Sequence, residues 1–535
     1  MAWSSFVDTK SSHAHPFLRI GKARALLATK IVLGLVLCLF AGCKKSGDDD
    51  AQRMFNQATA LLDEAREAET RSYDEAEGLY VQGLDYLEQL QESHGSTAIS
   101  WRMKLGEEKA TGYTVSELRG RILPQIRSKA RAERNFHEAA SRFADRISND
   151  PDKRVRALNK LAESYIKQAN KQEAREILEE SLLESKKVKD PMRGLDLKIK
   201  ISRLYAQNGM PREERRILDK AKDSAESARL GVERVRRKVL LCGALAESGR
   251  IEPALEVARG IDHTLKDYAL GAVAVALAGQ GDARLAKDVA QGIRLERPKI
   301  EALVNMAGAL VEAGGTESSW KLLSQSAALL KKYDVPSTVA LNKARMAEIY
   351  AKTGKTKKAE SILGEALVLA RKNEDFDMRF VRELAVRTLV SLSSAYTTVG
   401  APDQGWQAGN DARALIHGFS DPHDRVRALI GLAEVSMEVR DEDAAKKALR
   451  KAVQQASKVK NPDWGAETGS ATVGIVRNYA KLGDFETALK VVMAIDDPGY
   501  RAISLAEIAA TYTMPKKGMP PKLKELMHQI VEELD

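Results

Sequence analysis

The feature that most constrains the fold of this chain is a short phrase that recurs along most of its length. The phrase consists of an apolar residue, a small residue, two variable residues and an aromatic residue. Its copies run from Leu161 to Tyr165, Ile201 to Tyr205, Met346 to Tyr350, Leu392 to Tyr396, Ile475 to Tyr479 and Ile508 to Tyr512. Copies that end in Leu instead end at Leu245, Leu277 and Leu310, and a degenerate copy ends at Ser436. Such internal similarity indicates a repeat architecture.

A helix stop follows each phrase four residues later. The stops are Gly209, Gly249, Gly281, Gly314, Gly354, Gly400 and Gly483, with Ala169, Arg440 and Lys516 as substitutes. Glycine suits the left-handed backbone position that ends a helix. Five residues further on lies a small residue of a second helix, at Ala174, Ala254, Ala286, Ser319, Ala359, Gly405, Ala445 and Ala488. Because successive stops are 32 to 46 residues apart, the spacing predicts an array of helical hairpins.

The phrase has a physical reason. Residues at i, i+1 and i+4 share one face of a helix, and a small side chain there lets a neighbouring helix approach closely. Several first helices also begin with Asp before Pro, at Asp150, Asp190, Asp421 and Asp497. Proline is tolerated there because the first amide of a helix has no intrahelical partner.

The hairpin pattern resembles the tetratricopeptide repeat (TPR) family. After Tyr350 and Gly354, the segment from Ala359 to Ala366 matches the small-large-small signature of that family's second helix, as do Ala445, Leu449 and Ala452. The family's first-helix Trp is absent, and many spacings exceed its 34 residues. Over about residues 130 to 515, the resemblance implies an all-α fold, a right-handed α-solenoid of TPR-like helical hairpins with about ten or more repeats.

Composition agrees with a helical, folded chain. Hydrophobic residues make up 44% and charged residues 30% of the 535 residues, which excludes wholesale disorder and a polytopic membrane protein. The 36 glycines and 15 prolines are too few for a loop-rich all-β chain.

The first residues predict a targeting signal. A basic stretch from Arg19 to Lys30 precedes an apolar run over residues 31–40, which is half the length of a membrane-spanning helix. Ala41, Gly42 and Cys43 then resemble the lipobox of bacterial lipoproteins, which implies that Cys43 is lipidated and becomes the new N-terminus. In that family's sorting pattern, Lys44 favours the outer over the inner membrane. An uncleaved signal anchor and a soluble protein with a spurious apolar start remain alternatives.

These observations divide the chain into five segments. We expect a lipoprotein-type signal peptide over 1–42, a flexible tether over 43–50 and an irregular helical region over 51–148. The TPR-like array is expected over 149–514, and a C-terminal capping helix over 515–535, because solenoids need their last apolar face covered.

Charge and cysteines point away from several classes of site. The net charge of +10 includes five basic residues against one acidic residue before Cys43, and elsewhere the two signs are interspersed, so no nucleic-acid partner is expected. Cys38, Cys43 and Cys242 form no disulfide framework or metal motif. Cys242 lies in the small column of the phrase, which predicts a packed, unreactive thiol.

No sequence motif indicates catalysis or a cofactor. No phosphate-binding loop, nucleophile elbow or histidine cluster is present, and the eight histidines are expected at surface or capping positions. Trp320 and Trp406 each follow a small residue of a second helix, so we expect both to pack between repeats.

The most variable positions of the first helices are the candidate contacts. Two residues before the aromatic column lie Glu163, Arg203, Glu348, Glu434 and Arg477, which the resemblance places on the concave, partner-binding face. The family's carboxylate clamp is not reproduced. We therefore expect a non-enzymatic, lipid-anchored adaptor that binds other proteins in a bacterial cell envelope. A subunit of an export or outer-membrane assembly machine is a narrower form of this expectation. The alternative is a protein that binds envelope polysaccharide or a small ligand.

Overall fold

The computed structural model is all-α. It describes residues 47–226, 231–372, 401–419, 421–438, 440–458 and 465–534, with residues 381–382, 385–386, 388–390, 392–393 and 396. Within these residues there are 25 α-helices and no β-strand, only an isolated bridge between Ala110 and Tyr113. The predicted all-α class is therefore confirmed.

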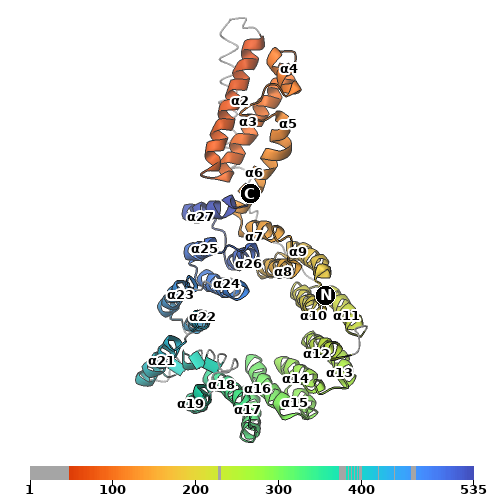
Figure 1. Cartoon of the computed structure of the whole chain (residues 1–535), viewed down its shortest axis with the longest axis vertical. Helices are drawn as coiled ribbons and strands as arrows, with labels where there is room; N and C mark the ends of the chain where they lie inside the picture. The colour runs from red at the N-terminus through yellow and green to blue at the C-terminus, as the bar shows by residue number, and fades with distance from the viewer. Residues whose placement is uncertain are drawn as a thin grey trace, which may run out of the picture. The chain divides into compact units, whose positions relative to one another are not determined.

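Within the described ranges, most helices follow one another with short connections (Figure 1). They are α2 (Gly47–Glu69), α3 (Tyr73–Ser93), α4 (Ala98–Leu105), α5 (Val115–Glu117), α6 (Leu123–Arg134), α7 (Phe136–Asp145), α8 (Pro151–Lys167), α9 (Lys171–Glu184), α10 (Pro191–Gln207), α11 (Pro211–Glu226), α12 (Val232–Glu247), α13 (Ile251–Arg259), α14 (Lys266–Gly279), α15 (Ala283–Gln291), α16 (Glu296–Glu312), α17 (Thr316–Leu330), α18 (Pro336–Lys352), α19 (Thr356–Lys372), α21 (Pro402–His417), α22 (Pro422–Glu438), α23 (Glu442–Ala456), α24 (Gly465–Lys481), α25 (Phe485–Met493), α26 (Pro498–Ala509) and α27 (Pro521–Glu532).

The chain divides into two compact units. Unit 1 contains the residues up to Glu67 and Gly78–Pro124, and unit 2 contains Ala68–Glu77 and Gln125–Asp535. In unit 1, helices α2 and α3 approach closely where Gly83 faces Leu62, since a Cβ on Gly83 would lie 2.8 Å from the Leu62 side chain. Helix α2 begins at Gly47, inside the stretch expected to be a tether, because three acidic residues in its first turn favour a helix N-terminus.

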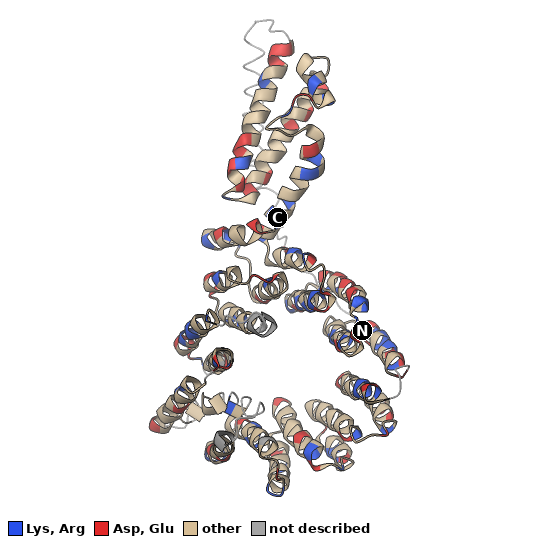
Figure 2. Cartoon of the chain, viewed as in Figure 1, with Lys and Arg blue, Asp and Glu red and all other residues tan. Residues whose placement is uncertain are grey.

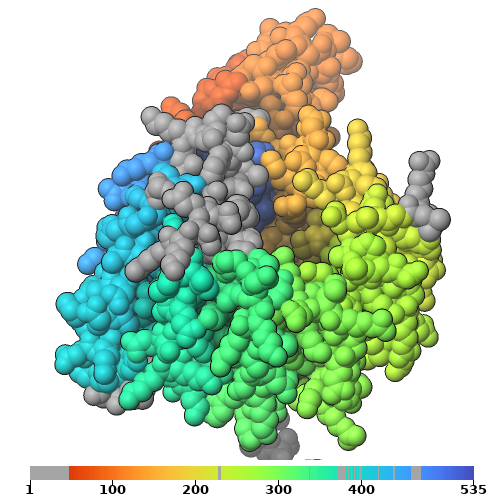
Figure 3. Space-filling view, turned by 60° about the horizontal axis from the view of Figure 1, so that its bottom comes forward, coloured from red at the N-terminus to blue at the C-terminus, as the bar shows by residue number. Residues whose placement is uncertain are grey.

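Unit 2 consists of helical hairpins. Each first helix packs against the second helix that follows it, as in α8 with α9, α18 with α19 and α22 with α23. Consecutive first helices also contact each other and form an inner layer, while the second helices lie outside them (Figure 1). In the space-filling view the hairpins lie side by side in chain order, from yellow-green through green to cyan (Figure 3). Lys and Arg are interspersed with Asp and Glu on the same helices (Figure 2).

The helix stops have the predicted left-handed backbone. Positive φ angles occur at Gly209, Gly249, Gly281, Gly314, Gly354 and Gly483. The substitutes Ala169 and Arg440 also adopt this conformation, with φ of 58° and 62°. Gly400 lies outside the described residues. Lys516 was the wrong substitute, because the positive φ nearby belongs to Gly518.

The small and aromatic columns form the core. The side chains of Ala162, Ala274, Ala307 and Ala347 are fully buried, as are the small residues of the second helices from Ala174 to Ala488 that the spacing predicted. Tyr350 is 1% exposed. The Asp caps are confirmed as well. The Asp190 side chain, for example, accepts hydrogen bonds from the backbone amides of Met192 and Arg193 at 2.9 and 3.0 Å.

The array of unit 2 closes on itself, because the first helix of its last hairpin packs against α7 and α8. Lys153 on α8 lies 2.7 Å from Asp497, the cap of α26. Gly499 makes the close approach of Lys153 to Asp497 possible, since a Cβ on Gly499 would lie 2.6 Å from Lys153 Cδ. At the other end of α26, the ring of Tyr512 meets the ring of Phe136 edge to face at 4.9 Å. The spacing of the phrase gave no sign of this closure.

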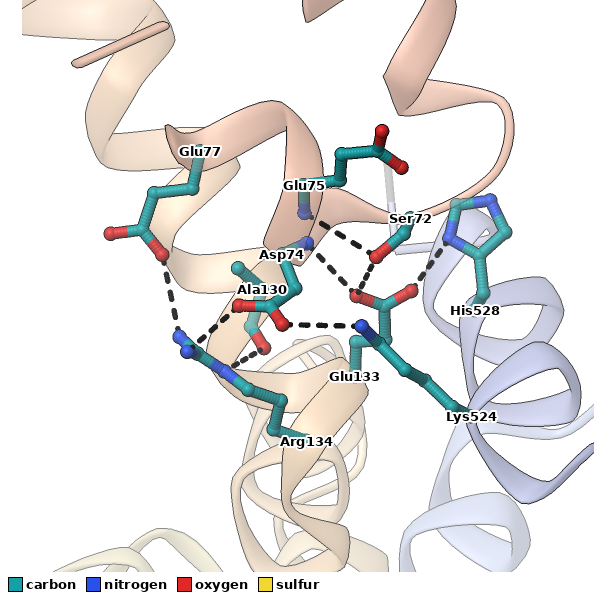
Figure 4. A network of polar contacts seen from close by, with 9 residues as sticks. All are labelled: Ser72, Asp74, Glu75, Glu77, Ala130, Glu133, Arg134, Lys524 and His528. Atoms are coloured by element: carbon teal, nitrogen blue, oxygen red, sulfur yellow. Dashed lines mark hydrogen bonds and ion pairs between the residues drawn. The ribbon is translucent and has the colours of Figure 1, made fainter. Parts of the chain in front are cut away.

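Helix α27 is held by a buried carboxylate (Figure 4). Glu133 on α6 has no exposed surface, and one of its oxygens lies 3.1 Å from Nδ1 of His528 on α27. Its other oxygen accepts hydrogen bonds from the backbone amide of Asp74 at 3.0 Å and the Ser72 hydroxyl at 3.2 Å. Lys524 adds an ion pair to Asp74 at 3.1 Å. Segments from both ends of the chain therefore meet at α6.

The expected signal peptide and Cys43 lie outside the described residues. Within the part that the structure describes, no helix is both long and apolar enough to cross a membrane.

Candidate interaction surface on the first helices

The five sequence-predicted contact residues all lie on first helices. Their helices are α8 for Glu163, α10 for Arg203, α18 for Glu348, α22 for Glu434 and α24 for Arg477. Glu434 is half-buried, and the other four form ion pairs. Four of the five predicted side chains are thus already engaged within the chain.

The structure brings two of these residues into one network. Lys160 Nζ lies 2.8 Å from both Glu163 and Glu507, and Arg477 Nε lies 2.6 Å from the same oxygen of Glu507. Glu507 on α26 is 3% exposed, so two cations compensate a buried carboxylate. Burial raises the pKa of Glu163, but hydrogen bonds from Lys160 and Lys167 outweigh it and lower that pKa below its usual value. Glu163 and Arg477 are therefore linked through Lys160 and Glu507 where the array closes.

Arg203 pairs with a residue that lines a cleft on the inner layer. Its guanidinium lies 2.5 Å from Glu247, at the C-terminal end of α12. Glu247 is one of the residues that line a cleft of about 610 Å³ over α12, α14 and α16. The other described lining residues are Tyr268, Gly271, Ala272, Val275, Ala276, Gly279, Gln280, Pro298, Glu301, Ala302, Asn305 and Ala309.

The floor of this cleft consists of small residues. A Cβ on Gly271 would lie 3.4 Å from Ala302 Cβ, so α14 and α16 approach almost to backbone contact. Such surfaces let a bound segment reach close to the helices, and they lose little side-chain entropy when covered. Val275 is the lining residue that stands in the same register as the five predicted contacts.

Polar side chains form the rim, and two of them have fixed partners. Glu301 accepts a hydrogen bond from Arg297 at 2.9 Å, and the Gln280 amide donates to the Ala246 carbonyl at 3.0 Å. Asn305 is exposed and offers both a donor and an acceptor. Burial raises the pKa of Tyr268, so its hydroxyl stays a neutral donor. The cleft can therefore hold a polar segment by hydrogen bonds along an apolar floor.

The hairpin of α8 and α9 matches the model of a known repeat family. Residues 155–187 match the model of the tetratricopeptide repeat, and the other hairpins repeat the same architecture. The chain is a TPR-repeat α-solenoid protein. None of the curated proteins searched matches its sequence.

Several solved structures are similar to this TPR-repeat protein. The apo form of the quorum sensor NprR from B. thuringiensis has 16% identity and a TM-score of 0.26, over 65% of this chain and 99% of that chain. A Rap protein complexed with competence and sporulation factor has 14% identity and a TM-score of 0.29, over 66% and 99%. A circular tandem repeat protein has 13% identity and a TM-score of 0.16, over 90% and 96%. At these scores the likenesses carry no conclusion about function.

Other sequence-predicted residues lie apart from the cleft. Cys242 is fully buried in the core, which confirms a packed thiol, and burial raises its pKa to about 12. Trp320 packs as predicted, since its Nε1 donates to Thr353 of the next hairpin at 3.0 Å. The prediction for Trp406 was wrong, because 67% of this side chain is exposed on α21.

The histidines were predicted at surface or capping positions, which is wrong for His137, His423 and His528. All three are buried. His137 stacks on Tyr165 with ring centres 4.1 Å apart, and burial lowers its pKa to about 4. Among the described residues, no group of three potential ligands could hold a metal ion.

Proposed function

We propose that this TPR-repeat protein is a non-enzymatic adaptor that binds an extended segment of a partner protein in the inner cleft. The observation that carries the proposal is the floor of glycine and alanine beneath a rim of polar side chains over α12, α14 and α16. A main chain that lies on such a floor satisfies its hydrogen bonds at the rim, with Asn305, Gln280 and Tyr268 in reach of an incoming segment.

The side chains of the inner cleft are already ordered, which favours a binding role over catalysis. Glu247 and Glu301, the two described carboxylates of the cleft, are each held by an arginine, so neither is a free acid or base. Because the side chains are already ordered, binding costs less conformational entropy. The closing contacts of α26 add to this, since they limit how far successive first helices can move apart.

The experiment is site-specific photo-crosslinking. A photo-reactive amino acid at Asn305 reports on the cleft, and the same group at the exposed Lys287 on α15 is the matched control. We expect discrete protein adducts from Asn305, their loss when Ala276→Arg fills the cleft, and no such adducts from Lys287. The proposal fails if Ala276→Arg leaves the adducts unchanged or if Lys287 gives the same set.

We further propose that the protein works at a bacterial envelope, anchored through Cys43. The support is the basic stretch, the short apolar run and the Ala41-Gly42-Cys43 sequence, with Lys44 favouring the outer membrane. A lipid anchor would raise the local concentration of the adaptor beside an export or assembly machine. Cys43→Ser should abolish incorporation of labelled palmitate and release the chain from membranes, and continued labelling would rule out this anchor.

Polysaccharide binding has less support. It would require several aromatic side chains along the cleft, and Tyr268 is the single aromatic among the described lining residues. We therefore keep the protein adaptor as the proposed function.

A further inference from the structure

A second cleft lies between α21 and α23, away from the inner cleft. Its volume is about 990 Å³, and α22 forms its floor between the two flanking second helices. Helix α21 contributes Gly409, Arg413 and His417, and helix α23 contributes a row from Ala444 to Gln455. This size is at the upper end of the range for ligand pockets.

The cleft carries an excess of positive charge. Its described lining contains five basic residues, Arg413, Arg425, Lys447, Arg450 and Lys451, against the acids Asp441 and Asp443. Asp441 is occupied as the cap of α23, since its side chain accepts a hydrogen bond from the Ala444 amide at 2.9 Å.

None of these five cations has an acidic partner within the described part of the chain. Arg413 donates to the Asn410 amide oxygen at 2.6 Å, and Arg425 donates to the amide oxygen of Gln455 at 3.3 Å. The Nε of Arg425 is buried with no acceptor. Lys447 and Lys451 stand one helical turn apart, where like charges destabilise an unliganded helix. An anionic group in the cleft would remove this repulsion and supply the missing acceptors.

The cleft is also apolar and has an exposed tryptophan beside it. Leu429, Leu432 and Ala448 lie on its floor and wall. Trp406 precedes Arg413 by seven residues on α21, so the two side chains share one stripe of the helix. With 67% of its surface exposed, Trp406 has the character of an interface anchor.

We propose that the cleft of α21, α22 and α23 binds an acidic, amphipathic segment of a partner protein. Carboxylates of the segment pair with Lys447, Lys451 and Arg413, while its apolar side chains cover Trp406 and the half-buried Leu432 of α22. A small inorganic anion would leave Trp406 exposed to water. This site is separate from the inner cleft and does not depend on the function proposed for it.

The test is a binding titration of the full chain in detergent. The probe is a fluorescent peptide of Glu-Glu-Leu-Leu repeats, compared with a peptide in which Gln replaces Glu. We expect the acidic peptide to bind at least about tenfold more tightly than the Gln peptide, with an affinity that falls as salt rises. Lys447→Glu combined with Lys451→Glu should weaken binding at least about tenfold, and Trp406→Ala about threefold.

The matched control is Lys516→Glu with Lys517→Glu. These two exposed lysines lie in the connection between α26 and α27 and change the net charge by the same amount. Control binding should equal that of the unchanged chain, and circular dichroism should show equal helix content in all variants. Three results would overturn the proposal: equal loss in the control, equal binding of the Gln peptide, or binding of inorganic phosphate or anionic lipid vesicles without binding of the acidic peptide.

Discussion

Lys160 on α8 and Arg477 on α24 contact the same oxygen of Glu507, at 2.8 and 2.6 Å. These three residues come from the first and the last two hairpins of the array. The contact satisfies a carboxylate that is 3% exposed, and it ties the two ends of unit 2 together. An open solenoid leaves its terminal apolar faces to capping helices. Here, α26 packs against the first hairpin as well.

The first prediction concerns Glu507. Glu507→Ala removes the acidic partner of Arg477 and leaves Lys160 paired with Glu163 alone. We expect the closing contact to lose about 2 kcal/mol of stability, less than for a fully buried pair because both cations are partly exposed. Hydrogen exchange of α26 measures this loss. In the double variant with Lys160→Met, the losses should not add. Simple additivity would show that Lys160 and Glu507 do not act as a pair.

Gly499 gives a second, steric prediction. Gly499→Ala places a methyl group against Lys153 and should weaken the closure by about 1 to 3 kcal/mol. The matched control is Gly364→Ala on α19, where a Cβ would meet nothing within 4 Å and should stabilise the helix slightly. Amide exchange in α8 and α26 should therefore speed up in the Gly499 variant alone. Equal exchange in the two variants would contradict the contact.

His137 predicts the pH dependence of stability. Burial holds its folded pKa at about 4, while the unfolded chain has the ordinary value of 6.5. Between these values the unfolded state binds more protons, so stability rises with pH from about 4 to 6.5 and is lost on acidification. The full effect is about 3 kcal/mol. His137→Phe, which keeps the stack on Tyr165, should flatten this acid limb in urea titrations. The exposed His417→Gln should not, and an unchanged limb in His137→Phe would refute the assignment.

Ala169 predicts a stabilising substitution. Its φ of 58° belongs to the left-handed region, which costs an alanine about 1 kcal/mol and a glycine almost nothing. Ala169→Gly should therefore stabilise the hairpin of α8 and α9 by about 1 kcal/mol in native-state hydrogen exchange. Gly209→Ala, at the equivalent stop with φ of 77°, should have the opposite sign. A loss of stability in Ala169→Gly would contradict the conformation at this stop.

The hairpins could be predicted from the sequence because each helix stop and each small residue determines the structure within its own hairpin. Even the unusual stop at Arg440 was predicted from spacing alone. The closure was not predictable in the same way, because it depends on small rotations between repeats that add up over the whole array.

The candidate site was likewise predicted only in part. The register of the first helices placed Glu163 and Arg477 correctly on first helices, but their partners Lys160 and Glu507 were missed. A signal existed, since both stand five residues before the aromatic column, at Tyr165 and Tyr512, with opposite charges in the first and last repeats. The cleft floor of Gly271 and Ala302 was missed because small residues carry no chemical signature of binding. The burial of Trp406 was predicted wrongly, because the small residue Gly405 before it does not determine whether the Trp406 side chain is covered.

The most direct test of the closed array is zero-length carbodiimide crosslinking of the full chain at low concentration. The Lys153 ammonium and the Asp497 carboxylate lie 2.7 Å apart, so they should form an amide bond within one molecule. Mass spectrometry should find peptides that join residues 153 and 497 in the monomer band, and Lys153→Arg should abolish them. Absence of this crosslink in the monomer, or its presence only in dimers, would contradict the closure.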